Sequence, residues 1–155
     1  MVSVIAKLDR SSRARLSWIQ SFAASFGIVP RPIYGHITLS VLAGAEEIAA
    51  SKAALAEQKA FSVDFHKMEV LGAENAVAAL AAPEGALAEI RGRLVPGEGE
   101  WTPCTVLLRD NMMNLNWVCT AMAQMFQPFT ARVDRIEFME NGEIIDGMDL
   151  KGEDA

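Results

Sequence analysis

Two polar residues, His36 and Thr38, stand two positions apart in a run of alternating polar and apolar residues. Residues two apart in an extended strand share a face and lie roughly 7 Å apart, so both side chains can reach one phosphate group. An imidazole near its free pKa gives or takes a proton at neutral pH, and a threonine hydroxyl donates to a phosphate oxygen. The pair indicates phosphate chemistry, although the same short pattern also arises by chance at an ordinary surface histidine.

Aromatic and basic residues near this pair and near a second strand are further candidates. Tyr34 lies two residues before His36 and Trp101 lies three residues before Cys104, where an aromatic ring either stacks on a base or packs on the strand below. Arg109 and Arg132 either supply charge for a phosphate or lie exposed at strand ends. These residues are predicted contributors to phosphate or base binding, with Tyr34, Trp101 and Arg109 the ones we select.

The remaining histidine and the two cysteines have plainer interpretations. His66 lies on the polar face of an alternating run and is predicted to be an exposed strand histidine, with a proton-transfer role as the alternative. Cys119 falls in an apolar helical stripe and is predicted to lie in the core. Cys104 is either a small buried residue or a nucleophile, and the nucleophile would need a base beside it that only the fold could bring, namely His36.

Composition indicates one globular domain. The chain has 155 residues, of which 51% are hydrophobic, and no apolar run approaches the roughly 20 residues that cross a bilayer. The N-terminus lacks the basic and apolar regions of a secretory signal, so a cytoplasmic location is predicted. Two cysteines and two histidines show none of the zinc spacings and are too few for a disulfide framework. Neither a metal nor a cofactor is expected.

The charge is unevenly distributed. The net charge is −6, yet residues 1–35 hold five basic residues against the single acidic Asp9. A predominantly acidic chain repels a long polyanion, which argues against duplex DNA as a partner. A small phosphodiester, a nucleotide or an RNA end at a basic patch is compatible with this charge, and so is the interpretation of the arginines as the solvated face of a helix.

Periodicity predicts alternating strands and helices. Strands are expected over 2–8, 34–41, 61–66, 76–82, 101–109 and 129–138, the last with a bulge, followed by a short pairing segment near Ile144. Helices are expected from about Asp9 to Gly27, over 45–59, from Pro83 to Leu94 and over 115–126. In the second strand, Ile37, Leu39 and Val41 should face one way and His36, Thr38 and Ser40 the other.

A repeated pattern suggests an internal duplication. A helix and a Pro/Gly loop precede each of the two strands that start at His36 and Cys104. The predicted fold class is α+β, a two-lobed pseudo-symmetric domain with mostly antiparallel sheets, helices on the outer faces and a central groove. The domain is expected to span residues 1–150, and residues 151–155 form an acidic C-terminal tail.

The order of elements and three local sequences resemble the two-histidine phosphoesterase superfamily, which comprises 2'-5' RNA ligase-like proteins and cyclic phosphodiesterases. The local sequences are Tyr34-Gly35-His36-Ile37-Thr38-Leu39, Trp101-Thr102-Pro103 and the closing strand over 128–133. The resemblance implies two lobes that each contribute a His-x-Thr/Ser motif to a central groove. It further implies that one histidine acts as base and the other as acid on a cyclic or diester phosphate, whose oxygens the hydroxyls hold.

The second motif departs from this pattern. The sequence there is Pro103-Cys104-Thr105-Val106-Leu107, with Cys104 in place of the histidine and Val106 in place of the hydroxyl residue. Thr105 is displaced by one position, so strand parity turns it away from the groove. A thiol with a free pKa of about 8.5 replaces an imidazolium poorly as general acid, and losing one such group costs about 10² to 10⁴ in rate.

The sequence therefore predicts a divergent phosphoesterase-like protein that keeps a phosphate- or nucleotide-binding groove, with weak, altered or lost phosphodiester hydrolysis. The predicted catalytic residues are His36 and Thr38, with Cys104 in place of the second histidine. The alternative is a catalytically inactive scaffold that binds another protein. Such a scaffold would use an acidic, methionine-rich surface, and the clustered methionines are Met112, Met113, Met122 and Met125.

Overall fold

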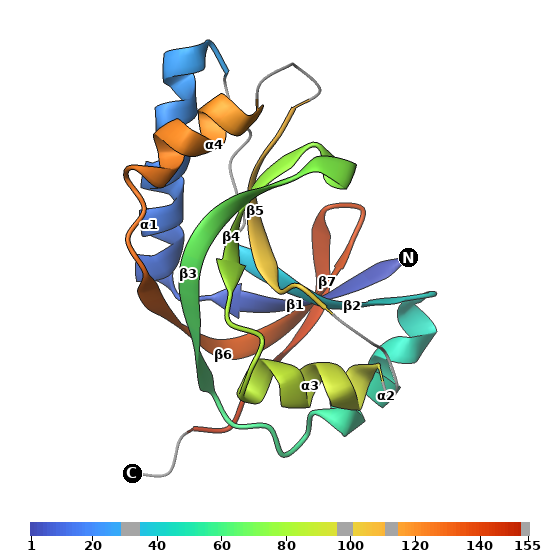
Figure 1. Ribbon diagram of the computed structural model, residues 1–155. Helices are drawn as coiled ribbons and strands as arrows, with labels where there is room; N and C mark the ends of the chain where they lie inside the picture. The colour runs from blue at the N-terminus through green and yellow to red at the C-terminus, as the bar shows by residue number, and fades with distance from the viewer. Residues whose placement is uncertain (29–34, 96–100, 111–114, 153–155) are drawn as a thin grey trace.

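The computed structural model describes residues 1–28, 35–95, 101–110 and 115–152 (Figure 1). Within them the fold is α+β, as predicted. The strands are β1 (Val2–Leu8), β2 (His36–Leu42), β3 (Phe61–Leu71), β4 (Ala76–Ala81), β5 (Cys104–Arg109), β6 (Phe129–Glu140) and β7 (Glu143–Asp149). The α-helices are α1 (Arg10–Gln20), α2 (Ile48–Ala54), α3 (Ala86–Leu94) and α4 (Leu115–Ala123).

The sheet consists of two halves that share the long strand β6. The strand order is β2-β1-β6-β3-β4-β5 with β7 also on β6, and every neighbouring pair of named strands is antiparallel. The first part of β6 pairs with β3, and the later part pairs with β1 and β7. We call β2, β1, β7 and the later part of β6 the first lobe, and β3, β4, β5 and the first part of β6 the second lobe. The predicted two-lobed antiparallel arrangement is confirmed.

Each lobe is covered by one helix from each half of the sequence. Helices α1 and α4 lie side by side on the second lobe, where α1 contacts β5 and α4 contacts β3 (Figure 1). Helices α2 and α3 lie together on the first lobe, where α3 contacts β2. The two helices that precede β2 and β5 therefore cross over, because α1 leads into β2 but packs on β5, and α3 leads into β5 but packs on β2.

The first helical segment begins and ends at the positions that the sequence indicates, although its α-helical part, α1, ends at Gln20. The carboxylate of Asp9 caps it by accepting hydrogen bonds from the backbone N–H of Ser12 (3.2 Å) and from its hydroxyl (2.6 Å). After Gln20 the chain tightens into a 3₁₀ turn over Ser21–Phe26, which Gly27 closes with a φ of 76°. That left-handed conformation is costly for any residue with a Cβ atom, so the predicted glycine cap is confirmed.

Several predicted boundaries were wrong. Helix α3 begins at Ala86 and not at Pro83, α4 ends at Ala123 and not at residue 126, and β5 begins at Cys104 and not at residue 101. Helix α2 ends at Ala54 and not near residue 59, because Gln58 and Ala60 hydrogen-bond to the backbone of Lys151. Strand β3 runs on to Leu71, and β7 has seven residues where a short segment was expected. Of the predicted acidic tail, residues 153–155 lie outside the described residues.

The two halves of the chain repeat each other's hydrogen bonds. The residue directly before His36 or Cys104 accepts a hydrogen bond from the last residue of the neighbouring strand, β1 or β4. The residue after that strand end donates to the strand on its other side, β6 or β3. The two sets are Leu8 to Gly35 (3.1 Å) and Asp9 to Arg132 (3.0 Å), and Ala81 to Pro103 (2.9 Å) and Ala82 to Asp64 (2.8 Å). The unit β1-α1-β2 is thus equivalent to β4-α3-β5, which supports the predicted duplication.

A bulge was predicted in the last long strand and is found there. In β6, Val133 pairs with Leu8 and Arg135 pairs with Lys7, so Asp134 is the extra residue. Among the described residues, no helix is long and apolar enough to cross a membrane.

Candidate functional site

The central groove lies between the edge strands β2 and β5. It has a volume of about 1960 Å³, and its walls include His36 and Thr38 from β2 and Cys104, Val106 and Arg109 from β5. The two strands come close to each other across it without pairing in the sheet. The fold therefore brings the residues of the two predicted motifs together in one cavity.

Strand register places the two motifs in equivalent positions. Lys7 pairs with His36 and Ile5 with Thr38 in the first lobe. Leu80 pairs with Cys104 and Ala78 with Val106 in the second lobe. Cys104 is therefore the structural counterpart of His36, and Val106 is the counterpart of Thr38. Thr105 is only 2% exposed and faces the core, as strand parity predicts.

Both motif strands carry a bulge one residue after the equivalent Thr38 and Val106 positions. Ser40 pairs with Val4 and Leu108 pairs with Val77, which leaves Leu39 and Leu107 as the extra residues. The bulge reverses parity, so Ser40 is buried and Val41 is 56% exposed. The prediction that Val41 would face the core with Leu39 was therefore wrong.

A side chain from the crossed-over helix satisfies the carbonyl of each bulged residue. Gln20 of α1 donates from Nε2 to the carbonyl of Leu107 at 2.6 Å, and Arg91 of α3 donates from Nη1 to the carbonyl of Leu39. A bulge removes its carbonyl from the regular ladder, and a buried carbonyl without a donor is costly. Sequence reasoning missed both residues. The available signal was a long polar side chain on the inner stripe of each helix.

His36 enters the groove from the start of β2. Gly35 precedes it with a φ of 74°, and a Cβ atom at Gly35 would overlap the side chain of Arg13. Burial lowers the pKa of His36 below its ordinary value. The imidazole is therefore neutral at neutral pH, the state in which it can accept a proton.

Cys104 stays protonated under the same conditions. Burial raises its pKa first, the carboxylate of Glu74 raises it further, and the guanidinium of Arg109 opposes both effects. A neutral thiol is a weak hydrogen-bond donor and a poor nucleophile. The groove thus contains a neutral base on one side and a neutral, poorly acidic group on the other.

The other predicted binding residues divide into three groups. Trp101 and Arg109 line the groove, with the guanidinium of Arg91 5.3 Å from the centre of the Trp101 ring. Tyr34 lies outside the described residues. His66 is exposed on β3 and does not contribute to the lining, and Cys119 is buried in α4. The exposed strand histidine and the core cysteine were thus predicted correctly.

Three acidic residues of the groove wall escaped the sequence analysis. They are Glu69 near the end of β3, Glu74 in the turn before β4, and Asp110 directly after β5. All three belong to the second lobe. No local pattern marks them, because only the long hairpin of β3 and β4 brings residues 69–74 against the end of β5.

The arrangement is similar to those of solved phosphoesterase structures. For E. coli LigT in its apo form the TM-score is 0.64 at 14% identity, with 97% of this chain and 96% of that chain covered. For TT0787 of Thermus thermophilus the TM-score is 0.64 at 15% identity, with 99% of each chain covered. A further structure described as a phosphoesterase gives a TM-score of 0.58 at 14% identity, with 97% of each chain covered.

The chain therefore has the fold of E. coli LigT. Structures of E. coli LigT include complexes with phosphate, ATP and 3'-AMP. The sequence matches no family model and no curated protein. The described groove has His36 and Thr38 on β2 and Cys104 and Val106 at the equivalent positions of β5.

Proposed function

We propose that the chain binds a nucleotide phosphate in the groove between β2 and β5 and hydrolyses phosphodiesters weakly or not at all. The observation that carries the proposal is the placement of His36 and Thr38 on the groove wall, directly across from the equivalent strand. The fold supports it, because LigT of the same fold has been crystallised with phosphate and with 3'-AMP.

The chemistry that the groove can supply is half of a general acid–base reaction. To hydrolyse a 2',3'-cyclic phosphate, His36 would accept a proton from water, whose oxygen then forms a bond to phosphorus. The bond from phosphorus to the ribose oxygen breaks, and that oxygen must receive a proton. Cys104 stands where this proton would come from, and its raised pKa makes the donation unfavourable. Binding is therefore expected to survive and turnover to be slow.

A thermal-shift screen with 2',3'-cyclic nucleotides and short oligoribonucleotides tests the binding. A ligand at 100 times its dissociation constant stabilises the protein by about 2.7 kcal/mol. At the same ligand concentration the stabilisation should fall to about 1.4 kcal/mol in the Thr38→Val variant, because this substitution keeps the volume of the side chain but removes the donor and weakens binding about tenfold. A parallel hydrolysis assay on the same ligands measures turnover.

A scaffold that binds another protein remains the second candidate, and one surface favours it. Trp18, Phe26 and Trp117 are exposed, and a hollow of about 360 Å³ lies between Phe26 and Trp117. Exposed aromatic clusters are typical of protein contact surfaces. The predicted methionine surface fits less well, because Met122 is fully buried and Met112 and Met113 lie outside the described residues. The absence of a thermal shift with every phosphate compound would favour the scaffold.

A further inference from the structure

The two walls of the groove differ in polarity at each equivalent position. Lys7, His36 and Thr38 of the first lobe correspond to Leu80, Cys104 and Val106 of the second. This correspondence follows from the pairing of β2 with β1 and of β5 with β4, and it does not depend on a sequence alignment. A phosphate can therefore find a base and a hydroxyl, His36 and Thr38, on one wall and neither of them at the same positions of the other.

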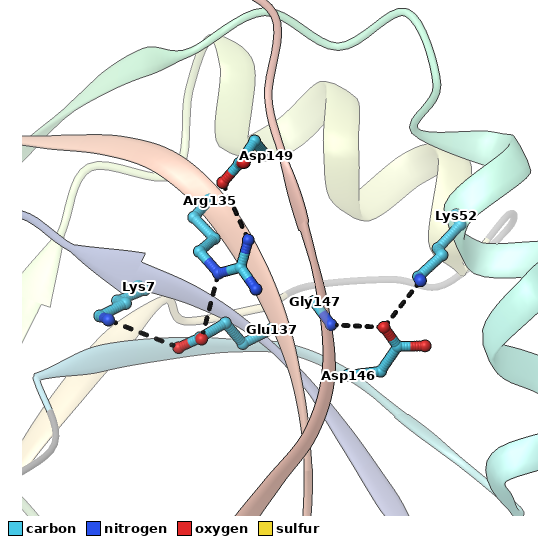
Figure 2. A network of polar contacts seen from close by, with 7 residues as sticks. All are labelled: Lys7, Lys52, Arg135, Glu137, Asp146, Gly147 and Asp149. Atoms are coloured by element: carbon cyan, nitrogen blue, oxygen red, sulfur yellow. Dashed lines mark hydrogen bonds and ion pairs between the residues drawn. The ribbon is translucent and has the colours of Figure 1, made fainter.

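Lys7 lies on the same face of the sheet as His36, because directly paired residues of neighbouring strands share a face. The neighbours of Lys7 along the strand, Ala6 and Leu8, belong to the hydrophobic core on the opposite face. The ammonium group of Lys7 is 3.9 Å from the Glu137 carboxylate, which is itself closer to Arg135, at 3.2 Å (Figure 2). Arg135 also pairs with Asp149 at 2.8 Å. The two cations and the two carboxylates of this cluster balance each other, and Lys7 is not among the residues that line the groove. The polar groups that this wall offers to a phosphate are therefore His36 and Thr38.

The acidic residues of the groove are all on the other wall. Glu69, Glu74 and Asp110 belong to the second lobe, and within the described lining the first lobe contributes no carboxylate. Arg109 lies among these acidic residues and donates to the backbone carbonyl of Glu74 at 3.3 Å. The local field of the second lobe therefore disfavours a doubly charged phosphate.

The second wall also has uncharged side chains beside these charged ones. Cys104, Val106, Leu71 and Trp101 are partly exposed in the groove. The guanidinium of Arg91 lies over the Trp101 ring, and the bond from Arg91 to the carbonyl of Leu39 fixes its position. A held aromatic ring beside small apolar side chains suits a flat, uncharged group such as a nucleobase.

We propose that the groove binds a nucleoside monophosphate in a single orientation, with the phosphate on the first lobe at His36 and Thr38 and the base on the second lobe beside Val106 and Trp101. This inference rests on the proposed function and deepens it. A symmetric groove would place the phosphate midway between the motifs, whereas this one places it on one wall.

Amide NMR titrations of the unaltered protein test the orientation with three probes: inorganic phosphate, adenosine and 3'-AMP. Inorganic phosphate should shift the amide signals of residues 36–40 and leave those of residues 104–108 unchanged. Adenosine should do the reverse, and 3'-AMP should shift both sets. Equal shifts of both strands by inorganic phosphate would overturn the orientation and leave the proposed function standing. Failure of both phosphate and 3'-AMP to bind would refute the proposed function itself.

Substitutions at matched positions add an affinity test. Thr38→Val should weaken inorganic phosphate about tenfold, because it removes a donor to a charged group. Thr120→Val, which removes an exposed hydroxyl from α4, is the matched control and should change the affinity less than twofold. Trp101→Ala should weaken 3'-AMP about tenfold more than it weakens inorganic phosphate. Tighter binding of inorganic phosphate by Val106→Thr would contradict the proposal.

Discussion

Strands β2 and β5 have the same backbone pairing, bulge and buried positions, which we call their shared frame, and they present different side chains to the groove. Ile37 and Thr105 occupy equivalent buried positions, and so do the bulged residues Leu39 and Leu107. Both bulges have their carbonyls satisfied from a helix of the other half of the chain. Positions 36 and 104 and positions 38 and 106, which face the cavity, differ in polarity and in hydrogen-bonding capacity.

The difference shows which positions the fold constrains. A buried residue in the frame contributes to packing, and a change there costs stability. A groove residue contributes little to packing because it is partly solvated, so Cys104 and Val106 can stand in the second strand without altering its course. The two strands thus differ in chemistry on an equivalent backbone, and we expect that the chemistry of β2 can be introduced into β5.

The largest expected effect is therefore a gain of activity. The combined substitutions Cys104→His and Val106→Thr give β5 the same two residue types as β2 at positions 36 and 38. We expect 2',3'-cyclic phosphodiesterase activity to rise by about 10²-fold or more, because a positioned general acid contributes that much. Each single substitution should give much less, because both side chains must contact one phosphate. Steady-state hydrolysis of 2',3'-cyclic nucleotides measures the gain.

The control for this gain is His36→Ala in the doubly substituted background, which should abolish it. If the doubly substituted protein folds, binds cyclic phosphate and hydrolyses none of it, the two strands are equivalent in position only. Activity that survives His36→Ala would place the reaction elsewhere.

Much of this frame could be predicted from the sequence, and the reasons are local. Alternation predicted β1 and the strands of both motifs, and Gly27 predicted the end of the first helix. The bulge at Leu39 could not be predicted, because the alternation of Ile37, Leu39 and Val41 is regular in sequence and is broken only by pairing with β1. The partners Gln20 and Arg91 were missed for a similar reason, since the crossing of α1 and α3 depends on tertiary packing.

The equivalence of the bulges at Leu39 and Leu107 can be tested by removing the side chains that donate to their carbonyls. Gln20→Ala and Arg91→Ala should each lower the free energy of unfolding by about 1 to 3 kcal/mol, because each leaves a strand carbonyl without its donor. Similar losses from the two halves would support a shared frame. Arg10→Ala, at an exposed position of α1, is the control and should change stability by less than about 0.5 kcal/mol. Urea denaturation measures the free energy of unfolding of all three variants. Little change in both Gln20→Ala and Arg91→Ala would show that these two hydrogen bonds do not stabilise the bulges.

Ser40 and Leu108 occupy equivalent buried positions of β2 and β5 and differ in polarity. Ser40 is 5% exposed, and its hydroxyl has no hydrogen-bond partner within the described part of the chain. Leu108 fills the equivalent position in β5. Ser40→Ala should therefore raise the free energy of unfolding by about 1 kcal/mol, because a buried polar group without a partner is destabilising. Ser62→Ala, at an exposed position of β3, provides the comparison, and a loss of stability in Ser40→Ala would show that the hydroxyl is satisfied.

The smallest expected effect concerns the pH dependence of stability and separates His36 from Cys104. Burial lowers the pKa of His36 in the folded state, so the unfolded chain binds a proton more readily as the pH falls below the ordinary histidine value of about 6.5. The contribution of the neutral His36 imidazole to the free energy of unfolding is therefore fully present above that pH. It is lost progressively as the pH falls toward the pKa of His36 in the folded state. Cys104 titrates far above this window because its pKa is raised.

Urea denaturation between pH 7.5 and 4.5 measures this dependence. His36→Gln should flatten the decline that begins near about pH 6.5, and Cys104→Ser should leave that part of the curve as it is in the unaltered protein. His66→Gln removes an exposed histidine from the bulge of β3 and is the control for a histidine outside the groove. A decline that persists unchanged in His36→Gln but disappears in His66→Gln would mean that the groove imidazole is solvated, and it would remove the reason for treating His36 as a neutral base.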